Sequence, residues 1–328
     1  MKRCPTLSDQ PATRWRVGKL LVLTLTLLGL ALALPALTLA YSTSSDLYGI
    51  ACANTGDCWA VSFKGTILHT SDGGATWKKQ KSGTTGLLSG VTFVNASQGW
   101  AVGIVGAILH TSDGGATWKK QTSGTAELLS GIAFANASHG WAVGGGGTIL
   151  HTRNGGATWK KQKSRTTAHL QAIACATTKD AWAVTDHGAI LHTSDGGATW
   201  KKQTSGTTEP LSGIAFANAS HGWAVGGGGA VLHTRNGGVT WKKQKSRTTG
   251  SLLNGVAFAN AEDGWAVGGS GSSGIILHTS DGGATWQTQE WGTTGYLSAV
   301  ACTNSENGWA VGTDGTILHT RNGGVTWT

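Results

Sequence analysis

The most informative part of the sequence is an octapeptide, Thr70-Ser71-Asp72-Gly73-Gly74-Ala75-Thr76-Trp77. It recurs along the chain, in some copies with Arg-Asn in place of Ser-Asp or with Val in place of Ala. The seven copies end at Trp77, Trp118, Trp159, Trp200, Trp241, Trp286 and Trp327, at intervals of 41 residues apart from one of 45. Self-similarity at such a period is typical of repeat proteins, in which neighbouring units stack and bury a shared core.

A second tryptophan series runs in step with the first, in the motif Trp-Ala-Val. Its members are Trp59, Trp100, Trp141, Trp182, Trp223, Trp265 and Trp309. The chain also has 52 Gly in 328 residues and only 12% charged residues. This composition argues against a helical domain, because Gly costs about 1 kcal/mol relative to Ala in a helix. It also argues against disorder, because disordered chains lack aromatic residues.

Each repeat is expected to form four short strands. In the third repeat, residues 129–134 alternate apolar and small or polar side chains, and Trp141-Ala142-Val143 begins a second strand. Glycine-rich turns lead to further strands at 148–151 and 159–162. Four strands in about 40 residues are typical of a propeller blade. The sequence therefore predicts an all-β fold, a seven-bladed β-propeller of four-stranded antiparallel blades, with a longer loop at 269–273 in the sixth.

The N-terminal region is predicted to be a separate unit. A basic flank precedes Leu20–Ala40, which carries no charge, so residues 1–40 are interpreted as a signal peptide or signal anchor. Either would place the propeller, residues 41–328, outside the cytoplasm, secreted or held at the membrane by this segment alone. The predicted blades span residues 47–86, 87–127, 128–168, 169–209, 210–250, 251–295 and 296–328.

The last predicted blade lacks most of a fourth strand, because the sequence ends at Thr328, one residue after the box tryptophan Trp327. Alignment by the repeat places Leu37–Ser42 where that strand would precede the first blade. We therefore hypothesise that an uncleaved N-terminus completes blade seven. A mature protein that begins at Tyr41 would refute this hypothesis.

The cysteines predict one local disulfide and no metal site. Cys52 and Cys58 flank a short turn, and an exported protein meets an oxidising compartment, so we expect them to be paired. No second pair has the spacing of zinc ligands. One histidine recurs per blade in Leu-His-Thr, but these side chains would be too far apart to meet one ion. We expect no metal, no cofactor and no catalytic residue.

The repeat resembles the Asp-box of bacterial-neuraminidase (BNR) repeats, Thr-x-Asp-x-Gly-x-Thr-Trp. Together with Gly-Trp-Ala-Val-Gly and Gly-x-Ile-Leu, it looks most like the photosystem II stability and assembly factor family, over residues 47–327. That resemblance implies a non-enzymatic propeller that holds a protein intermediate while a membrane complex is assembled. The same box occurs in sialidases and xyloglucanases, so a carbohydrate-binding protein or glycoside hydrolase is the alternative, and a purely structural surface protein comes third.

The charged residues of the repeat have structural interpretations. The box Asp is replaced by Asn154, Asn236 and Asn322 in three copies, which suits a turn-forming side chain better than a required carboxylate. Lys-Lys follows the box Trp in five blades, where it would protect an outer strand edge, so no nucleic-acid partner is expected. A hydrolase pair could come from Asp186 and Asp314, although their short loops would struggle to bring them within about 5–10 Å.

Residues that break the symmetry of the repeat are the better guide to a partner site. They occur in the turns between second and third strands and in the connectors between blades, which should share the face opposite the boxes. Neutral sequence variation in surface loops would explain any single one of these residues equally well. Our candidates for binding a protein partner are Lys64, Arg165, Asp186, His187, Arg247, Trp291, Tyr296 and Asp314, with Trp291 and Tyr296 preferred.

Overall fold

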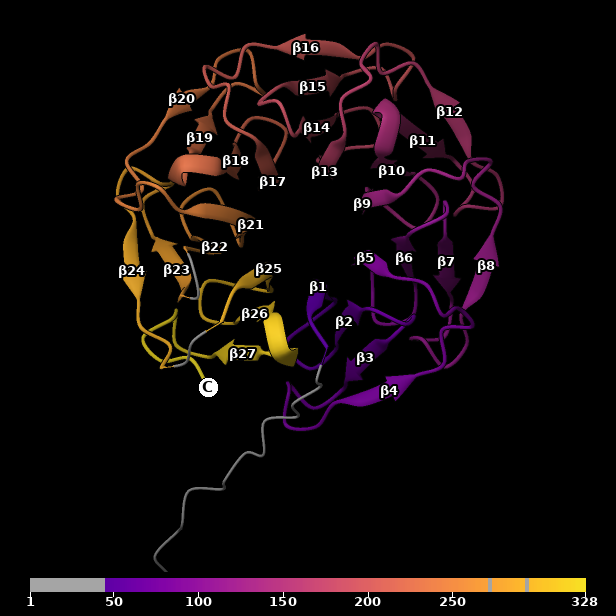
Figure 1. Ribbon diagram of the computed structural model, residues 1–328, viewed down its shortest axis with the longest axis horizontal. Coiled ribbons are helices and arrows are strands. Elements are labelled where there is room, and N and C mark those ends of the chain that lie inside the picture. The colour runs from indigo at the N-terminus through magenta and orange to yellow at the C-terminus, as the bar shows by residue number, and fades with distance from the viewer. Residues whose placement is uncertain (1–44, 271–272, 293–294) are drawn as a thin grey trace, which may run out of the picture. The chain divides into compact units, whose positions relative to one another are not determined.

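The computed structural model describes residues 45–270, 273–292 and 295–328, which form seven antiparallel sheets arranged in a ring (Figure 1). The predicted seven-bladed β-propeller is therefore confirmed. The predicted signal segment, residues 1–40, and the strand hypothesised at Leu37–Ser42 lie outside the described residues.

The blades follow one another along the chain, each numbered from its innermost strand outward. Blade one has β1 (Leu47–Cys52), β2 (Cys58–Ser62), β3 (Ile67–Thr70) and β4 (Lys78–Gln80). Blade two has β5 (Leu88–Phe93), β6 (Gly99–Gly103), β7 (Ile108–Thr111) and β8 (Lys119–Gln121). Blade three has β9 (Leu129–Phe134), β10 (Gly140–Gly144), β11 (Thr148–Thr152) and β12 (Lys160–Gln162), with the short 3-10 turn η1 (Gly145–Gly147). Blade four has β13 (Leu170–Cys175), β14 (Ala181–Thr185), β15 (Ile190–Thr193) and β16 (Lys201–Gln203).

The remaining blades complete the ring. Blade five has β17 (Leu211–Phe216), β18 (Gly222–Gly226), η2 (Gly227–Gly229), β19 (Val231–Thr234) and β20 (Lys242–Lys243). Blade six has β21 (Leu252–Phe258), β22 (Gly264–Ser270), β23 (Ser273–Thr279) and β24 (Gln287–Gln289). Blade seven has β25 (Leu297–Cys302), β26 (Gly308–Gly312), η3 (Thr313–Gly315) and β27 (Ile317–Thr320). The extra residues of blade six thus lengthen β22 and β23 instead of forming the predicted long loop.

The core lies between blades, because successive side chains of a strand point to opposite faces of its sheet. In blade three, Trp141 and Val143 of β10 and Ile149 of β11 pack against blade four. Ala142 and Leu150 face the other way and pack against blade two. Every residue of β10 is buried as a result. This explains why the Trp-Ala-Val motif can be apolar throughout instead of alternating.

Polar side chains tie each blade to the next. At the contact between blades one and two, the amide of Gln80 donates to the Gly114 carbonyl at 2.9 Å and accepts from the Trp118 indole N–H at 3.1 Å. The same glutamine recurs as Gln121, Gln162, Gln203, Gln244 and Gln289. Both box glycine and box tryptophan are therefore held by the preceding blade.

The contact that closes the ring is built differently. Trp309 and Val311 of blade seven pack with Leu47 of blade one. The Arg321 guanidinium, in place of a glutamine, donates to the Gly73 carbonyl at 2.9 Å. The sheet of blade seven has three strands, and Thr328 adds one residue of a fourth by pairing with the backbone of His319.

Cys52 and Cys58, the predicted pair, lie opposite each other in the β1–β2 hairpin and are joined by a disulfide. Cys175 and Cys302 occupy the same position of the inner strand in blades four and seven, but Ala181 and Gly308 lie opposite them. Both thiols are free, and burial raises their pKa to about 12.

Candidate partner-binding face

The turns of the propeller gather on two faces. On one, here called the box face, each Asp-box turn bonds to the turn between the first two strands, as Gly73 N–H does to the Gly56 carbonyl at 3.0 Å. On the other, the loop face, the turn between second and third strands bonds to the connector that leads to the next blade. Gly106 N–H, for example, donates to the Glu127 carbonyl at 2.9 Å. The predicted candidate residues all belong to the loop face.

The box closes by side-chain hydrogen bonds within one turn. In blade one, the Thr70 hydroxyl donates to Asp72 Oδ1 at 2.7 Å and accepts from Gly74 N–H at 2.9 Å. Asp72 Oδ1 also accepts the Thr76 N–H at 2.8 Å. These bonds to Thr76 and Thr70 lower the pKa of Asp72 to about 2. The carboxylate is fully engaged in the turn, which supports its structural interpretation.

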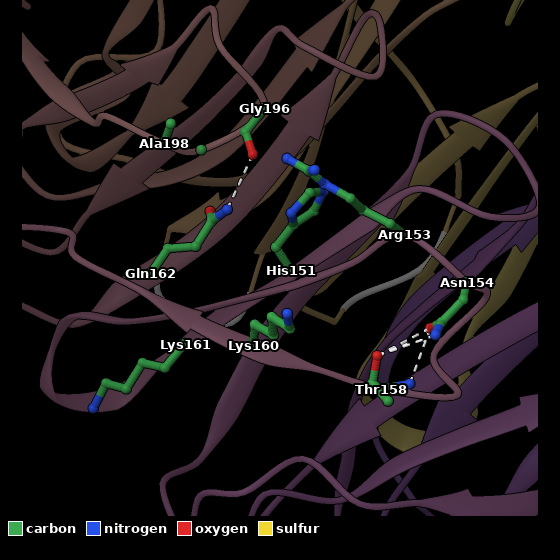
Figure 2. A pocket seen from close by; sticks show the side chains of 10 residues that line it. His151, Arg153, Asn154, Thr158, Lys160, Lys161, Gln162, Gly196 and Ala198 are labelled. Atoms are coloured by element: carbon green, nitrogen blue, oxygen red, sulfur yellow. Dashed lines mark hydrogen bonds between the residues drawn. The ribbon is translucent and has the colours of Figure 1, made fainter.

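The asparagine version of the box makes the same turn. Asn154 Oδ1 accepts the Thr158 N–H at 2.9 Å, and its amide donates to the Thr158 hydroxyl at 3.1 Å. Figure 2 shows this turn at the edge of a hollow of about 510 Å³ between blades three and four, which Arg153 and Lys160 also line. An amide therefore replaces the carboxylate without loss of the turn.

The repeated histidines are packing residues of single blades. Six of the seven stack on the tryptophan of the neighbouring strand, as His151 does on Trp141 with ring centroids 4.6 Å apart, and the ring of His278 is tilted by 32° against Trp265. In blade one the imidazole also meets the carboxylate of Asp57 at 3.3 Å. His139 takes the place of that carboxylate in blade three, and burial, together with Arg153 and His139, lowers the pKa of His151 to about 4. Within the described residues, no group of three or more His, Cys, Asp or Glu could hold a metal ion.

The loop face carries unusual backbone. The non-glycine residues with positive φ in the described chain are Lys64, Val105, Arg165, Arg247 and Asp314, with φ between 53° and 60°. All of them lie in loop-face turns or connectors, and all are exposed. A left-handed backbone costs an L-residue other than Gly roughly 1–2 kcal/mol. Other blades have glycine at the equivalent positions, such as Gly146 and Gly83.

The predicted candidates do not form one cluster. Lys64, Arg165, Arg247 and Asp314 belong to blades one, three, five and seven. In blade four, His187 Nδ1 lies 2.6 Å from Asp186 Oδ1. Blades four and seven lie on opposite sides of the ring, so Asp186 and Asp314 are not brought together (Figure 1).

The structure disagrees with the predicted site at its preferred aromatic pair, Trp291 and Tyr296. A role of Trp291 in binding a partner requires an exposed indole, but only 9% of Trp291 is accessible. Its indole donates to the Gly274 carbonyl at 3.4 Å beneath the β22–β23 hairpin, where a Cβ on Gly274 would lie 2.2 Å from the ring. Tyr296 is half-buried, and its backbone bonds to the η3 turn through Thr313. Trp291 is thus a packing residue of blade six.

Two features of the loop face were missing from the predicted site. Asp46 Oδ1 accepts the Asp314 N–H at 3.1 Å, so the start of blade one contacts the turn of blade seven. Phe63, Ile104 and Val105 are large apolar side chains exposed by 46%, 37% and 70%. The available signal for these three was their position, because blades three and five have glycine in the same turn.

Among the described residues, no helix is long and apolar enough to cross a membrane. The structure defines a class: a seven-bladed Asp-box propeller with uniform turns on one face and irregular, strained turns on the other. Comparison with known proteins is more specific. The family model described as photosynthesis system II assembly factor YCF48 matches residues 36–123, 121–210 and 202–293, and the chain belongs to this family.

Solved structures share the fold. YCF48 from Cyanidioschyzon merolae is 23% identical, with a TM-score of 0.70 over 85% of this chain and 96% of that chain. A structure described as YCF48 bound to D1 peptide is 20% identical, with a TM-score of 0.70 over 85% and 94% of the two chains. A GH74 xyloglucanase from Xanthomonas campestris is 13% identical, with a TM-score of 0.70 over 87% and 54%. No curated protein matches the chain.

Proposed function

We propose that this protein is an exported, non-enzymatic propeller whose loop face binds a segment of a partner protein during assembly of a membrane complex. One observation carries the proposal: every strained non-glycine residue in the described chain lies on the loop face and is exposed to solvent. Strained backbone that packing does not require is characteristic of functional sites. The box face, by contrast, repeats the same structural turn in every blade.

The nature of the partner follows from the family. A structural neighbour, YCF48, is described as bound to D1 peptide. We therefore propose a D1-type peptide as the first partner to test. Arg165 and Arg247 are exposed cations on connectors of the loop face, suited to carboxylates of such a segment.

The non-enzymatic part of the proposal rests on the arrangement of acidic groups. The box carboxylates are engaged by Thr side chains and backbone, as at Asp113. Asp186 is paired with His187, and Asp314 lies on another blade. Glycoside hydrolysis requires two carboxyls about 5–10 Å apart across one substrate. This arrangement argues against a glycoside hydrolase. A carbohydrate-active protein is the alternative function, and a hydrolysis screen with xyloglucan tests it.

Export is proposed from the uncharged N-terminal segment and from the disulfide between Cys52 and Cys58. Disulfides persist in oxidising compartments and are rare in the cytosol. Fractionation of cells that produce the full chain tests this part independently of binding. Recovery in the cytoplasm with reduced cysteines would contradict it.

The binding test compares two matched variants of the full chain. Arg165→Gly with Arg247→Gly removes two cations from the loop face and installs the residue found at Gly83. Arg153→Ser with Arg235→Ser removes two cations from the box face and installs the residue found at Ser71. We expect the first pair to weaken binding of a labelled D1 peptide about tenfold, or 1.4 kcal/mol, and the second to leave it within about twofold.

Three results would contradict the proposed function. The peptide could fail to bind at all, or the box-face pair could be the one that weakens it, which would move the site to the hollow beside Arg153. Turnover of xyloglucan that Asp186→Asn or Asp314→Asn abolishes would show an enzyme instead.

A further inference from the structure

Exposed apolar side chains of two neighbouring loop-face turns, in blades one and two, are here called the apolar ridge. The turns meet at Gly86, whose carbonyl accepts the Gly65 N–H at 2.6 Å and on which a Cβ would lie 3.1 Å from Ile104. The ridge consists of Phe63 in the β2–β3 turn and Ile104 and Val105 in the β6–β7 turn, and all three are exposed. The Tyr48 ring packs edge-on against Phe63 with centroids 5.2 Å apart, which fixes one end of the ridge. In the described chain, the other large apolar side chains that are similarly exposed are Val239 and Val325, both in boxes.

Val105 is held in a conformation that the fold does not need. Its φ is 56°, and a β-branched residue in the left-handed region is a true outlier. Blades three and five have Gly146 and Gly228 at this position, with φ of 58° and 63°. The Val105 side chain is 70% exposed, so packing in the free protein does not offset its strain. A side chain that costs stability and contacts mainly solvent suggests a role in binding.

A hollow adjoins the ridge. It measures about 590 Å³ and lies between Val105 and residues 120–126, which run from the end of β8 into the connector, with Lys120 and Ser123 among its lining residues. Lys120 brings a positive charge to its lining, and Lys64, which follows Phe63 on the ridge, is an exposed cation outside it. Among the described residues, neither lysine forms an ion pair. The carboxylate of Glu127, which follows the lining residue Ala126, lies beside Gly145 and Gly146 in the turn of blade three.

We propose that this ridge and hollow form the anchoring subsite for the partner, and that they take a peptide segment with an apolar side chain next to a carboxylate. The apolar side chain packs on Ile104 and Val105, and the carboxylate pairs with Lys120 in the hollow. Exposed apolar patches rimmed by polar groups are typical of protein interaction sites. The inference rests on the proposed function of the loop face, and it adds which kind of peptide that face would recognise.

The test uses a phage-displayed library of random linear peptides, selected on the full chain. We expect enriched peptides to carry an aromatic or aliphatic residue beside Asp or Glu. The best synthetic peptide is then titrated into Val105→Gly, Val105→Asn and Phe63→Ala. Gly and Asn both tolerate the left-handed backbone, so these two Val105 variants keep the turn. Each variant should bind about tenfold more weakly, while the Tm of Val105→Gly does not fall.

The matched control is Val239→Ala, which removes a side chain of similar exposure from the box face and should leave the peptide affinity unchanged. Three outcomes overturn the subsite: no enrichment, enrichment of basic peptides, or equal affinity for all ridge variants. If ridge variants bind normally but Arg165→Gly with Arg247→Gly does not, the subsite is wrong and the loop-face function stands. If only Arg153→Ser with Arg235→Ser loses binding, the proposed function fails as well.

Discussion

On the box face, a threonine, an aspartate or asparagine and two glycines make the same hydrogen bonds in all seven blades, as at Thr70 and Asp72. On the loop face, the turn between second and third strands has Lys64 in blade one, Val105 in blade two and Gly146 in blade three, all at similar φ. The two faces therefore differ in what their side chains do for the fold. Box side chains stabilise their turns, whereas several loop-face side chains strain theirs.

This difference separates the residues that the fold requires from those that it merely tolerates. Changes on the box face should lower stability and leave binding intact. Changes on the loop face should do the opposite.

Lowering the pH should have the largest effect on stability, through buried histidines next to the boxes. Burial, together with a neighbouring arginine, lowers the pKa of His151, His233 and His319 from 6.5 to about 4. The unfolded chain therefore binds more protons between these values. The stability from the neutral imidazoles is complete above pH 6.5 and is lost as the pH falls to about 4. Thermal unfolding followed at pH 7, 5.5 and 4 should show a falling Tm.

A control for the acid effect is His139→Asp with His221→Asp. These changes place a carboxylate beside His151 and His233, as Asp57 lies beside His69 in blade one. We expect a smaller loss of Tm between pH 7 and 4 in this variant. An unchanged Tm of the unmodified chain across the range would refute the role of the buried histidines.

Thr111→Val should have the next largest effect. The Thr111 hydroxyl is buried, donates to Asp113 Oδ1 and accepts the Gly115 N–H, each at 2.8 Å. Valine leaves that buried amide without a partner, which costs about 1–3 kcal/mol. Urea unfolding measures the loss. Thr85→Val, an exposed connector threonine, is the control and should change stability little.

Asp113 should tolerate Asn but not Ala. Asp113→Ala removes the bonds to Thr117 and should cost about 1 kcal/mol. Asp113→Asn should stay within about 0.5 kcal/mol of the unmodified chain, because Asn154 makes the same turn in blade three. An Asn variant as unstable as the Ala variant would mean that the box needs a charge.

The smallest expected effect is an increase in the free energy of unfolding. Lys64→Gly and Arg165→Gly each relieve a left-handed backbone, partly offset by the greater freedom of Gly in the unfolded chain, so each should add up to about 1 kcal/mol. The same urea titration checks this. A loss of stability in both variants would show that these side chains support the fold, against the contrast drawn between the faces.

The fold was predictable because its determinants are local and repeated. Each box carries its own turn, and each Trp-Ala-Val strand carries its own pattern of burial. The loop face was less predictable, because its details depend on distant residues. Trp291 is buried by a glycine of a hairpin that precedes it, and Asp46 bonds to Asp314, 268 residues away. The strain at Val105 arises because its turn has a left-handed backbone, and the sequence hints at this only through the glycines, Gly146 and Gly228, at the same position of blades three and five.

Amide hydrogen exchange of the full chain, with and without a saturating bound peptide, tests the central claim most directly. We predict that binding slows exchange at loop-face amides, around residues 63–65, 104–106, 165–167 and 247–249, and leaves the box turns unchanged. Protection confined to the boxes, such as residues 153–158 and 235–240, would contradict the account.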